Sequence, residues 1–109
     1  EVAGQVFLNF RISLEEQFMH LHQVKDYASL LAITEKHLNE LCKKSTGKTA
    51  SELIYDRIVL EAKRLLMHSS MNNKEVAYQL SFDDPSHFSK FFKRKVGISP
   101  SGFRKKWNN

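Results

Sequence analysis

The sequence predicts an all-α domain of about seven helices. Apolar residues recur at steps of three and four along most of the chain, which is the period of an amphipathic helix. Only four Gly and two Pro occur in 109 residues, and no segment alternates apolar and polar residues as a half-buried strand does. The 41% of hydrophobic and 27% of charged residues are typical of a folded globular chain. We therefore expect one helical domain over residues 1–109.

The N-terminal part predicts three helices. The first, over residues 6–21, carries an apolar stripe at helical spacing: Phe7, Phe10, Leu14, Phe18 and Leu21. Segments 24–33 and 34–49 supply the next two.

The longest predicted helix follows, over residues 50–70. Its apolar positions keep helical spacing: Leu53, Ile54, Ile58, Ala62, Leu65 and Leu66. Thr49 and Glu52 match a capping box, which marks the helix start. From residue 50 to residue 68 such a helix is on the order of 28 Å long. We expect residues 49–68 to link two subdomains, residues 5–48 and residues 69–109.

The C-terminal part predicts three shorter helices. Asn72 and Glu75 give a second capping signature before a helix over residues 74–80. The segment DDPSHFSKFFKRKVGISPSGFR, residues 83–104, supplies the next helix. Ser99 and Pro100 within it begin the last one, because Pro suits the first position of a helix.

One unit occurs twice in the chain. A shift of 50 residues aligns HLNELCKKSTGKTASEL, from residue 37, with HFSKFFKRKVGISPSGF, from residue 87. Upstream the shift becomes 49, so the second copy has one extra residue around positions 83–85. Each copy predicts a short helix, a turn near residues 32–34 or 81–84, and a second helix. That is the outline of a helix-turn-helix.

The second helix of each unit has a core-facing side and an outward side. Phe88, Phe91 and Phe92 fall at i, i+3 and i+4 and therefore share the core-facing side. The outward positions are polar: Ser86, Ser89, Lys90, Lys93 and Arg94 in the second copy, and Lys36, Asn39, Glu40 and Lys43 in the first. Such a surface suits the major groove of DNA, with base edges in front and phosphates on either side. Two such helices about 34 Å apart would read successive groove segments, a spacing compatible with the long helix.

Positive charge is concentrated in the second half of the chain. Residues 1–60 carry seven Lys/Arg and eight Asp/Glu, whereas residues 61–109 carry ten and four, for a net charge of +5. This distribution favours a polyanionic partner. One alternative is a helical protein-interaction module whose basic face docks on an acidic partner, and another is an architectural DNA binder with little sequence preference. The first alternative does not explain why the outward polar positions repeat, and competition with random duplex would separate the second from sequence-specific binding.

No pattern predicts catalysis, a metal or a cofactor. Paired-carboxylate, Ser-His-Asp and phosphate-loop motifs are missing from the sequence, so we expect no enzyme. His20 and His22 lack further ligands nearby in the sequence. Cys42 aligns with Phe92 and is expected to be a core thiol. A single cysteine, without a signal peptide or an apolar run of about 20 residues, indicates a cytoplasmic protein.

Residues 5–106 resemble the C-terminal DNA-binding domain of the AraC/XylS family of bacterial transcription regulators. The likeness is strongest in AYQLSFDDPSHFSKFFKRKVGISPSGFR, residues 77–104, and the linker-helix pattern is found at Arg57, Leu60, Ala62, Leu65 and Leu66. The resemblance implies binding to asymmetric double-stranded promoter sites, contact with RNA polymerase, and activation or repression of transcription. Because the chain starts at Glu1 without Met, we expect the output half of a larger sensor protein.

The resemblance also implies which residues contact DNA. Base reading falls on Lys36, Asn39, Glu40, Pro85, Ser86, Ser89 and Lys90. Contacts with the DNA backbone fall on Lys43, Lys93 and Arg94 and on amides at the helix starts near Thr49 and Ser99. Apart from the resemblance, His37 and His87 recur at equivalent positions of the repeat, and we expect them to contact the DNA backbone or to pack against a helix rather than to take part in catalysis.

Several positions depart from the family pattern or have a second interpretation. Ser81 stands where Gly is usual, and a positive φ there would cost Ser about 1 kcal/mol. Gln23 replaces the usual Ser or Thr cap of the helix over residues 24–33 and is a weaker cap. Arg57 is expected to bridge to an acidic neighbour rather than to contact DNA. Glu40 repels phosphate, so it is either a specificity element or an indication that the first unit binds less tightly.

Overall fold

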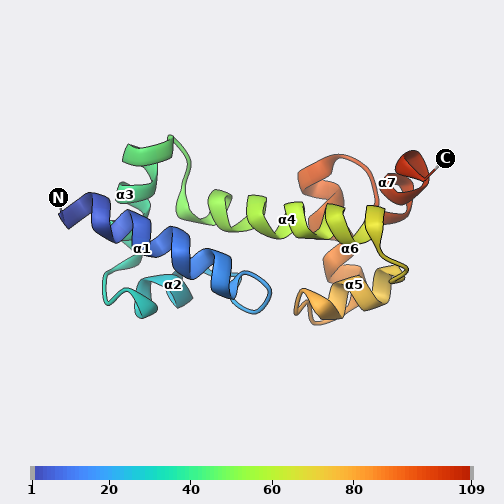
Figure 1. The fold of residues 1–109 in the computed structure, drawn as a ribbon, viewed down its shortest axis with the longest axis horizontal. Coiled ribbons are helices and arrows are strands. Elements are labelled where there is room, and N and C mark those ends of the chain that lie inside the picture. Colours follow the sequence, from blue (N-terminus) through green and yellow to red (C-terminus); the bar gives the residue numbers. More distant parts are fainter. Residues whose placement is uncertain (1, 109) are drawn as a thin grey trace. The chain divides into compact units, whose positions relative to one another are not determined.

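The computed structural model describes residues 2–108, and these residues form seven α-helices and no strand (Figure 1). The helices are α1 (Val2–Gln17), α2 (Val24–Leu30), α3 (Glu35–Thr46), α4 (Ala50–His68), α5 (Asn73–Gln79), α6 (Pro85–Val96) and α7 (Pro100–Trp107). The chain divides into an N-terminal unit, Glu1–Arg57, and a C-terminal unit, Ile58–Asn109, and α4 runs from one into the other. The predicted class is therefore confirmed: all-α, with two helix-turn-helix subdomains, α2–α3 and α5–α6, joined by a long helix.

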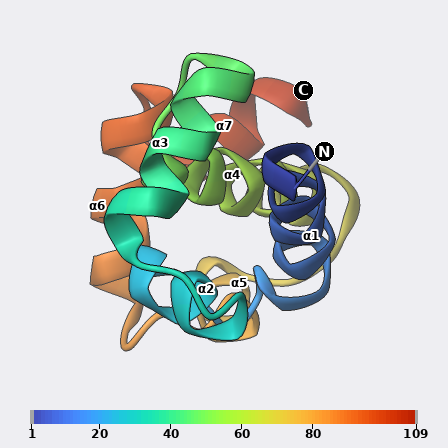
Figure 2. The ribbon, with the colours of Figure 1, turned by 90° about the vertical axis from the view of Figure 1, so that its left-hand side faces the viewer.

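The N-terminal unit is organised around α1, which packs against both α2 and α3 (Figure 2). The rings of Phe10 and Tyr27 meet edge to face, with their centroids 5.7 Å apart, and neither side chain is exposed. The Tyr27 hydroxyl donates a hydrogen bond of 2.8 Å to the carbonyl oxygen of Leu21. Burial, and secondly the charge of Asp26, raise the pKa of this phenol. The contact fixes the start of α2 against α1.

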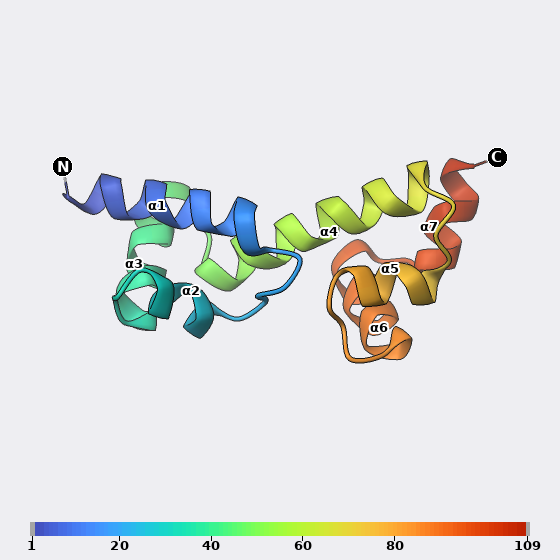
Figure 3. The ribbon, with the colours of Figure 1, turned by 60° about the horizontal axis from the view of Figure 1, so that its bottom comes forward.

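The C-terminal unit is built on a chain of aromatic contacts. Helix α5 packs against α6, and α6 packs against α7 (Figure 3). The Phe88 ring lies 5.4 Å from Phe82 and 5.8 Å from Phe92, measured between centroids, and Phe92 lies 5.5 Å from Phe103. These rings join α6 to the preceding turn and to α7, so the helix is held from two sides.

The predicted ends of the first helix are wrong by four residues. The sequence predicted residues 6–21, whereas α1 begins at Val2 and ends at Gln17. The apolar stripe was interpreted correctly, because Phe18 is still buried and its N–H still donates to the carbonyl oxygen of Leu14. Spacing identifies the buried side of a helix but not its ends, which depend on caps and turns.

The next two helices are also shorter than predicted. Helix α2 stops at Leu30 instead of residue 33, because Ala32 takes a left-handed backbone with φ of 56°. Helix α3 stops at Thr46, where Gly47 forms a left-handed cap with φ of 80°.

Candidate nucleic-acid interface

The two helix-turn-helix units have the same turn. In the first, the Ile33 N–H donates to the carbonyl oxygen of Ala28 over 3.0 Å; in the second, the Phe82 N–H donates to that of Ala77 over 2.9 Å. Ala32 and Ser81 both adopt a positive φ, of 56° and 63°. The positive φ considered for Ser81 is therefore confirmed. Five residues separate α5 from α6 and four separate α2 from α3, which confirms the extra residue of the second copy.

The second helix of each unit begins at a side-chain cap. Thr34 Oγ1 accepts from the His37 N–H, and Asp84 Oδ1 accepts from the His87 N–H, each over 3.0 Å. The Ser86 hydroxyl also donates to Asp84 Oδ1 over 2.6 Å. The Ser86 hydrogen bond, followed by the His87 amide, lowers the pKa of the Asp84 carboxyl. By contrast, Gln23, which was predicted to be a weaker cap, makes no side-chain cap hydrogen bond at the start of α2.

The core-facing sides of α3 and α6 are buried as predicted. Helix α3 contributes Leu38, Leu41 and Cys42, and α6 contributes Phe88, Phe91 and Phe92. Cys42 is a buried free thiol, and its burial raises the pKa to about 11, outweighing the opposite effect of Arg11. These contacts leave one side of each helix available for another molecule.

The residues predicted to read bases lie on that outward side. Four of them are exposed: Lys36, Glu40, Ser86 and Lys90. Asn39, Pro85 and Ser89 are half-buried at the edge of the same surfaces. Six of the residues predicted to contact the DNA backbone are exposed and Thr49 is half-buried; the exposed ones are His37, Lys43, His87, Lys93, Arg94 and Ser99. In each unit both sets therefore lie on the second helix, and the backbone-contacting set extends to the start of the following helix. Contact with DNA stays a prediction.

Asn39 has a partner that the sequence did not reveal. Its Oδ1 accepts a hydrogen bond of 2.9 Å from the backbone N–H of Ala50, the first residue of α4. The side chain predicted to read a base therefore joins α3 to the start of the long helix.

The hydroxyls at the starts of α4 and α7 act as caps. Thr49 Oγ1 accepts from the Glu52 N–H over 3.1 Å, and Glu52 Oε1 accepts from the Thr49 N–H over 3.0 Å, which confirms the predicted capping box. Asn72 and Glu75 form the second predicted box. Ser99 Oγ accepts from the Gly102 N–H over 3.0 Å and precedes Pro100 at the first position of α7. Both hydroxyl oxygens thus accept hydrogen bonds within the chain, and contact of these helix starts with phosphate stays a prediction.

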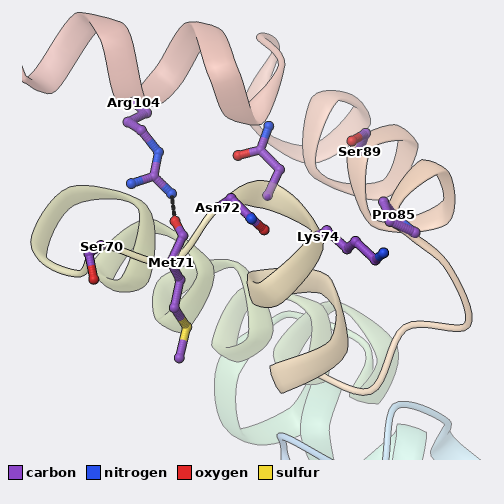
Figure 4. Close-up of a pocket in the computed structure, with 8 residues that line it drawn as sticks. Ser70, Met71, Asn72, Lys74, Pro85, Ser89 and Arg104 are labelled. Atoms are coloured by element: carbon purple, nitrogen blue, oxygen red, sulfur yellow. Dashed lines mark hydrogen bonds between the residues drawn. The ribbon is translucent and has the colours of Figure 1, made fainter.

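Sequence reasoning missed Lys74, which lies beside α6. Lys74 lines an open pocket of about 710 Å³ together with Pro85 and Ser89, at the start of α5 (Figure 4). The Arg104 guanidinium closes the opposite side by donating to the carbonyl oxygens of Met71 and, over 3.3 Å, of Ser69. The repeat contained the signal: at the shift of 49, Lys74 aligns with Lys25, and each is the exposed second residue of its helix.

The remaining polar candidates, His87 and Arg57, lie beside acidic side chains of the protein itself. The His87 ring faces two carboxylates, with Nδ1 3.6 Å from Asp84 Oδ2 and 3.9 Å from Asp83 Oδ2. Arg57 Nε donates to Glu15 Oε2 over 2.6 Å, and its guanidinium carbon lies 3.8 Å from the centroid of the Phe18 ring. The predicted acidic bridge of Arg57 is thus confirmed.

The described part of the chain offers neither a metal site nor a membrane span. Residues 2–108 contain no group of three His, Cys, Asp or Glu side chains placed to hold a metal ion. No helix in the same range combines the length and the apolar run that a membrane span requires.

The chain is similar to known regulators in sequence and in fold. The family model of a helix-turn-helix domain matches residues 27–106. The transcriptional activator RhaR of Cronobacter sakazakii is 32% identical over 84 residues, which cover 77% of this chain and 30% of RhaR. The DNA-binding domain of AdpA, solved with a target DNA, superposes with a TM-score of 0.82 at 22% identity, covering 94% of this chain and 92% of that one.

A regulator from Chromobacterium violaceum, described as containing an AraC-type DNA-binding domain, has a TM-score of 0.77 at 20% identity, covering 97% of this chain and 96% of the other. The chain spans about a third of the length of the curated relatives it matches. The match over residues 27–106 and the paired helix-turn-helix units show that this chain belongs to the AraC/XylS family of helix-turn-helix transcription regulators.

Proposed function

We propose that this domain binds one asymmetric double-stranded promoter site, with α3 and α6 in successive major-groove segments. The observation that carries the proposal is the duplicated geometry. Each unit has a left-handed turn, a capped second helix pinned by three buried residues, and an exposed polar side on that helix. The 19 residues of α4 form one uninterrupted helix of about 28 Å, which is compatible with groove segments about 34 Å apart.

The proposal assigns base reading and backbone contact to different side chains. The side chains that face the base edges are Lys36 and Glu40 on α3, and Pro85, Ser86, Ser89 and Lys90 on α6. The groups that face phosphates are Lys43, Lys93, Arg94, the two histidines, and the helix starts at Thr49 and Ser99. Lys74 adds a further cation beside α6. The rival protein-interaction module is not favoured, because the family and its DNA-bound neighbour both indicate nucleic acid.

The wider setting belongs to the same proposal. Relatives about three times as long are named as transcriptional activators, which supports a role as the output part of a larger cytoplasmic sensor that is not an enzyme. Such a part acts on transcription by contacting RNA polymerase next to its site, as the family resemblance implies.

Selection from a random pool tests the proposal. The chain is incubated with random duplexes of about 30 base pairs at physiological salt, and bound duplexes are amplified and sequenced. We expect one asymmetric consensus, bound about 10³-fold or more tightly than random duplex. A variant with Lys90→Ala and Ser86→Ala should lose bases from one part of the consensus only. Recovery of an unenriched pool contradicts sequence-specific binding and favours the architectural alternative.

A further inference from the structure

The two units differ at one matched pair of positions. At the shift of 50, Asn39 on α3 aligns with Ser89 on α6, and Ala50 at the start of α4 aligns with Pro100 at the start of α7. Ala50 and Pro100 are both fully buried. Ala50 has a backbone N–H, whereas Pro100 has none.

Because of that difference, only the N-terminal unit requires a hydrogen-bond acceptor from its second helix. A buried N–H at the start of a helix has no partner within the helix and must find an acceptor elsewhere. In the N-terminal unit the acceptor is Asn39 Oδ1, 2.9 Å from the Ala50 nitrogen. In the C-terminal unit there is no donor to satisfy at Pro100, and the matched Ser89 instead lines the open pocket beside Lys74 and Pro85 (Figure 4).

We propose that Asn39 is a positioning residue: it clamps α3 to the first residue of α4, and the matched base-reading role belongs to Ser89 alone. The inference rests on the proposed DNA-binding function and makes it asymmetric. The N-terminal unit then reads bases chiefly with Lys36 and Glu40, one turn or less from the clamp. The Asn39–Ala50 hydrogen bond also links the start of α4 directly to α3.

A double-mutant cycle without DNA tests the clamp. Asn39→Ala leaves the Ala50 N–H buried without its acceptor, so the unfolding equilibrium constant should rise about tenfold. Ala50→Pro replaces the N–H by a ring carbon that stands between the nitrogen and Asn39 Oδ1, too close to that oxygen, and should cost a similar factor although Pro suits the first position of a helix. The combined variant has neither the N–H donor at residue 50 nor the Asn39 side-chain amide that would obstruct the proline ring. At these positions it resembles the C-terminal unit. Its unfolding equilibrium constant should lie within about threefold of the wild-type value, measured by urea denaturation monitored by circular dichroism.

Selection from random duplexes then separates clamping from base reading. The double variant should select the wild-type consensus, because its α3 is again well placed, while the matched control Ser89→Ala should change the preferred bases. The inference is overturned if the two single effects multiply in the double variant, or if that folded variant selects different bases. Failure of the wild-type chain to select any duplex overturns the proposed function, and the unfolding cycle still decides whether the clamp exists.

Discussion

Ala32 and Ser81 occupy the same left-handed position in the two turns, with φ of 56° and 63°. A side chain in this region costs roughly 1–2 kcal/mol, partly offset because Gly loses more entropy on folding. We therefore expect Ala32→Gly to increase the free energy of unfolding by about 0.5–1 kcal/mol, measured by urea denaturation. Ala32 is the cleaner test, since only a methyl group is removed.

The matched control has the opposite sign. Gly47 has φ of 80° and no atom within 4 Å of the place where a Cβ would stand, so Gly47→Ala probes backbone strain alone. It should reduce the free energy of unfolding by about 1 kcal/mol. If Ala32→Gly destabilises the protein as well, strain does not determine the stability of these turns.

Lys93 and Ser89 lie on the same helix, but replacing them should affect DNA binding in different ways. Lys93 is exposed near the end of α6, and Lys93→Ala should weaken binding to all duplexes and lower the salt slope of log K by about 0.9. Ser89→Ala should change the preferred sequence and leave the slope unchanged. Titrations of consensus and random duplexes at several salt concentrations measure both quantities. Equal losses on both duplexes for both variants would contradict the division of roles.

At the scale of the element, Asp84 makes α6 sensitive to acid. Its carboxylate caps the helix and accepts from the Ser86 hydroxyl, and its pKa is lowered in the folded chain. A lowered folded pKa means that the stabilisation is present above the unfolded value of about 3.9 and is lost as pH falls through the folded value. Thr34, which caps α3 at the matched position, does not titrate.

Replacing Asp84 by Asn keeps an acceptor for the cap and removes the titration. We expect Asp84→Asn to flatten the loss of stability between about pH 5 and pH 2, followed by urea unfolding at each pH. Asp83→Asn removes the same charge from the neighbouring residue without touching the cap, and should keep the acid-induced loss. An unchanged pH profile in Asp84→Asn would show that the cap is not the titrating contact.

The helices themselves were largely predictable from sequence, because their signals are local. Capping boxes located the starts of α4 and α5, and Ser99 with Pro100 located that of α7. The end of α1 was not predictable, since its stripe continues to Phe18 although the helix has stopped. Spacing measures which residues are buried together, and a turn can bury a residue as well as a helix can.

The candidate interface was predictable in outline but not in detail. Repeat alignment and helical spacing found the outward sides of α3 and α6, and the structure leaves Lys36, Ser86 and Lys90 exposed there. The bond from the Ala50 N–H to Asn39 joins residues 11 apart, and no local motif indicates it. Tertiary hydrogen bonds of this kind depend on how two helices approach each other, which periodicity does not specify.

Across the two units, sequence-specific binding requires that one duplex engage both of them. Each unit has an exposed polar helix, and the 19 residues of α4 connect the two without a break. One unit alone offers few base contacts, whereas two connected units make the second binding event intramolecular. Affinity should therefore fall steeply when either half of the DNA site is lost.

Hydroxyl-radical footprinting of the selected duplex tests this most directly. We expect a single chain to protect two segments on one face of the DNA, with centres about 10–10.5 base pairs apart. Lys36→Ala should weaken protection in one segment and Lys90→Ala in the other. A single protected segment that responds to both substitutions would contradict the account.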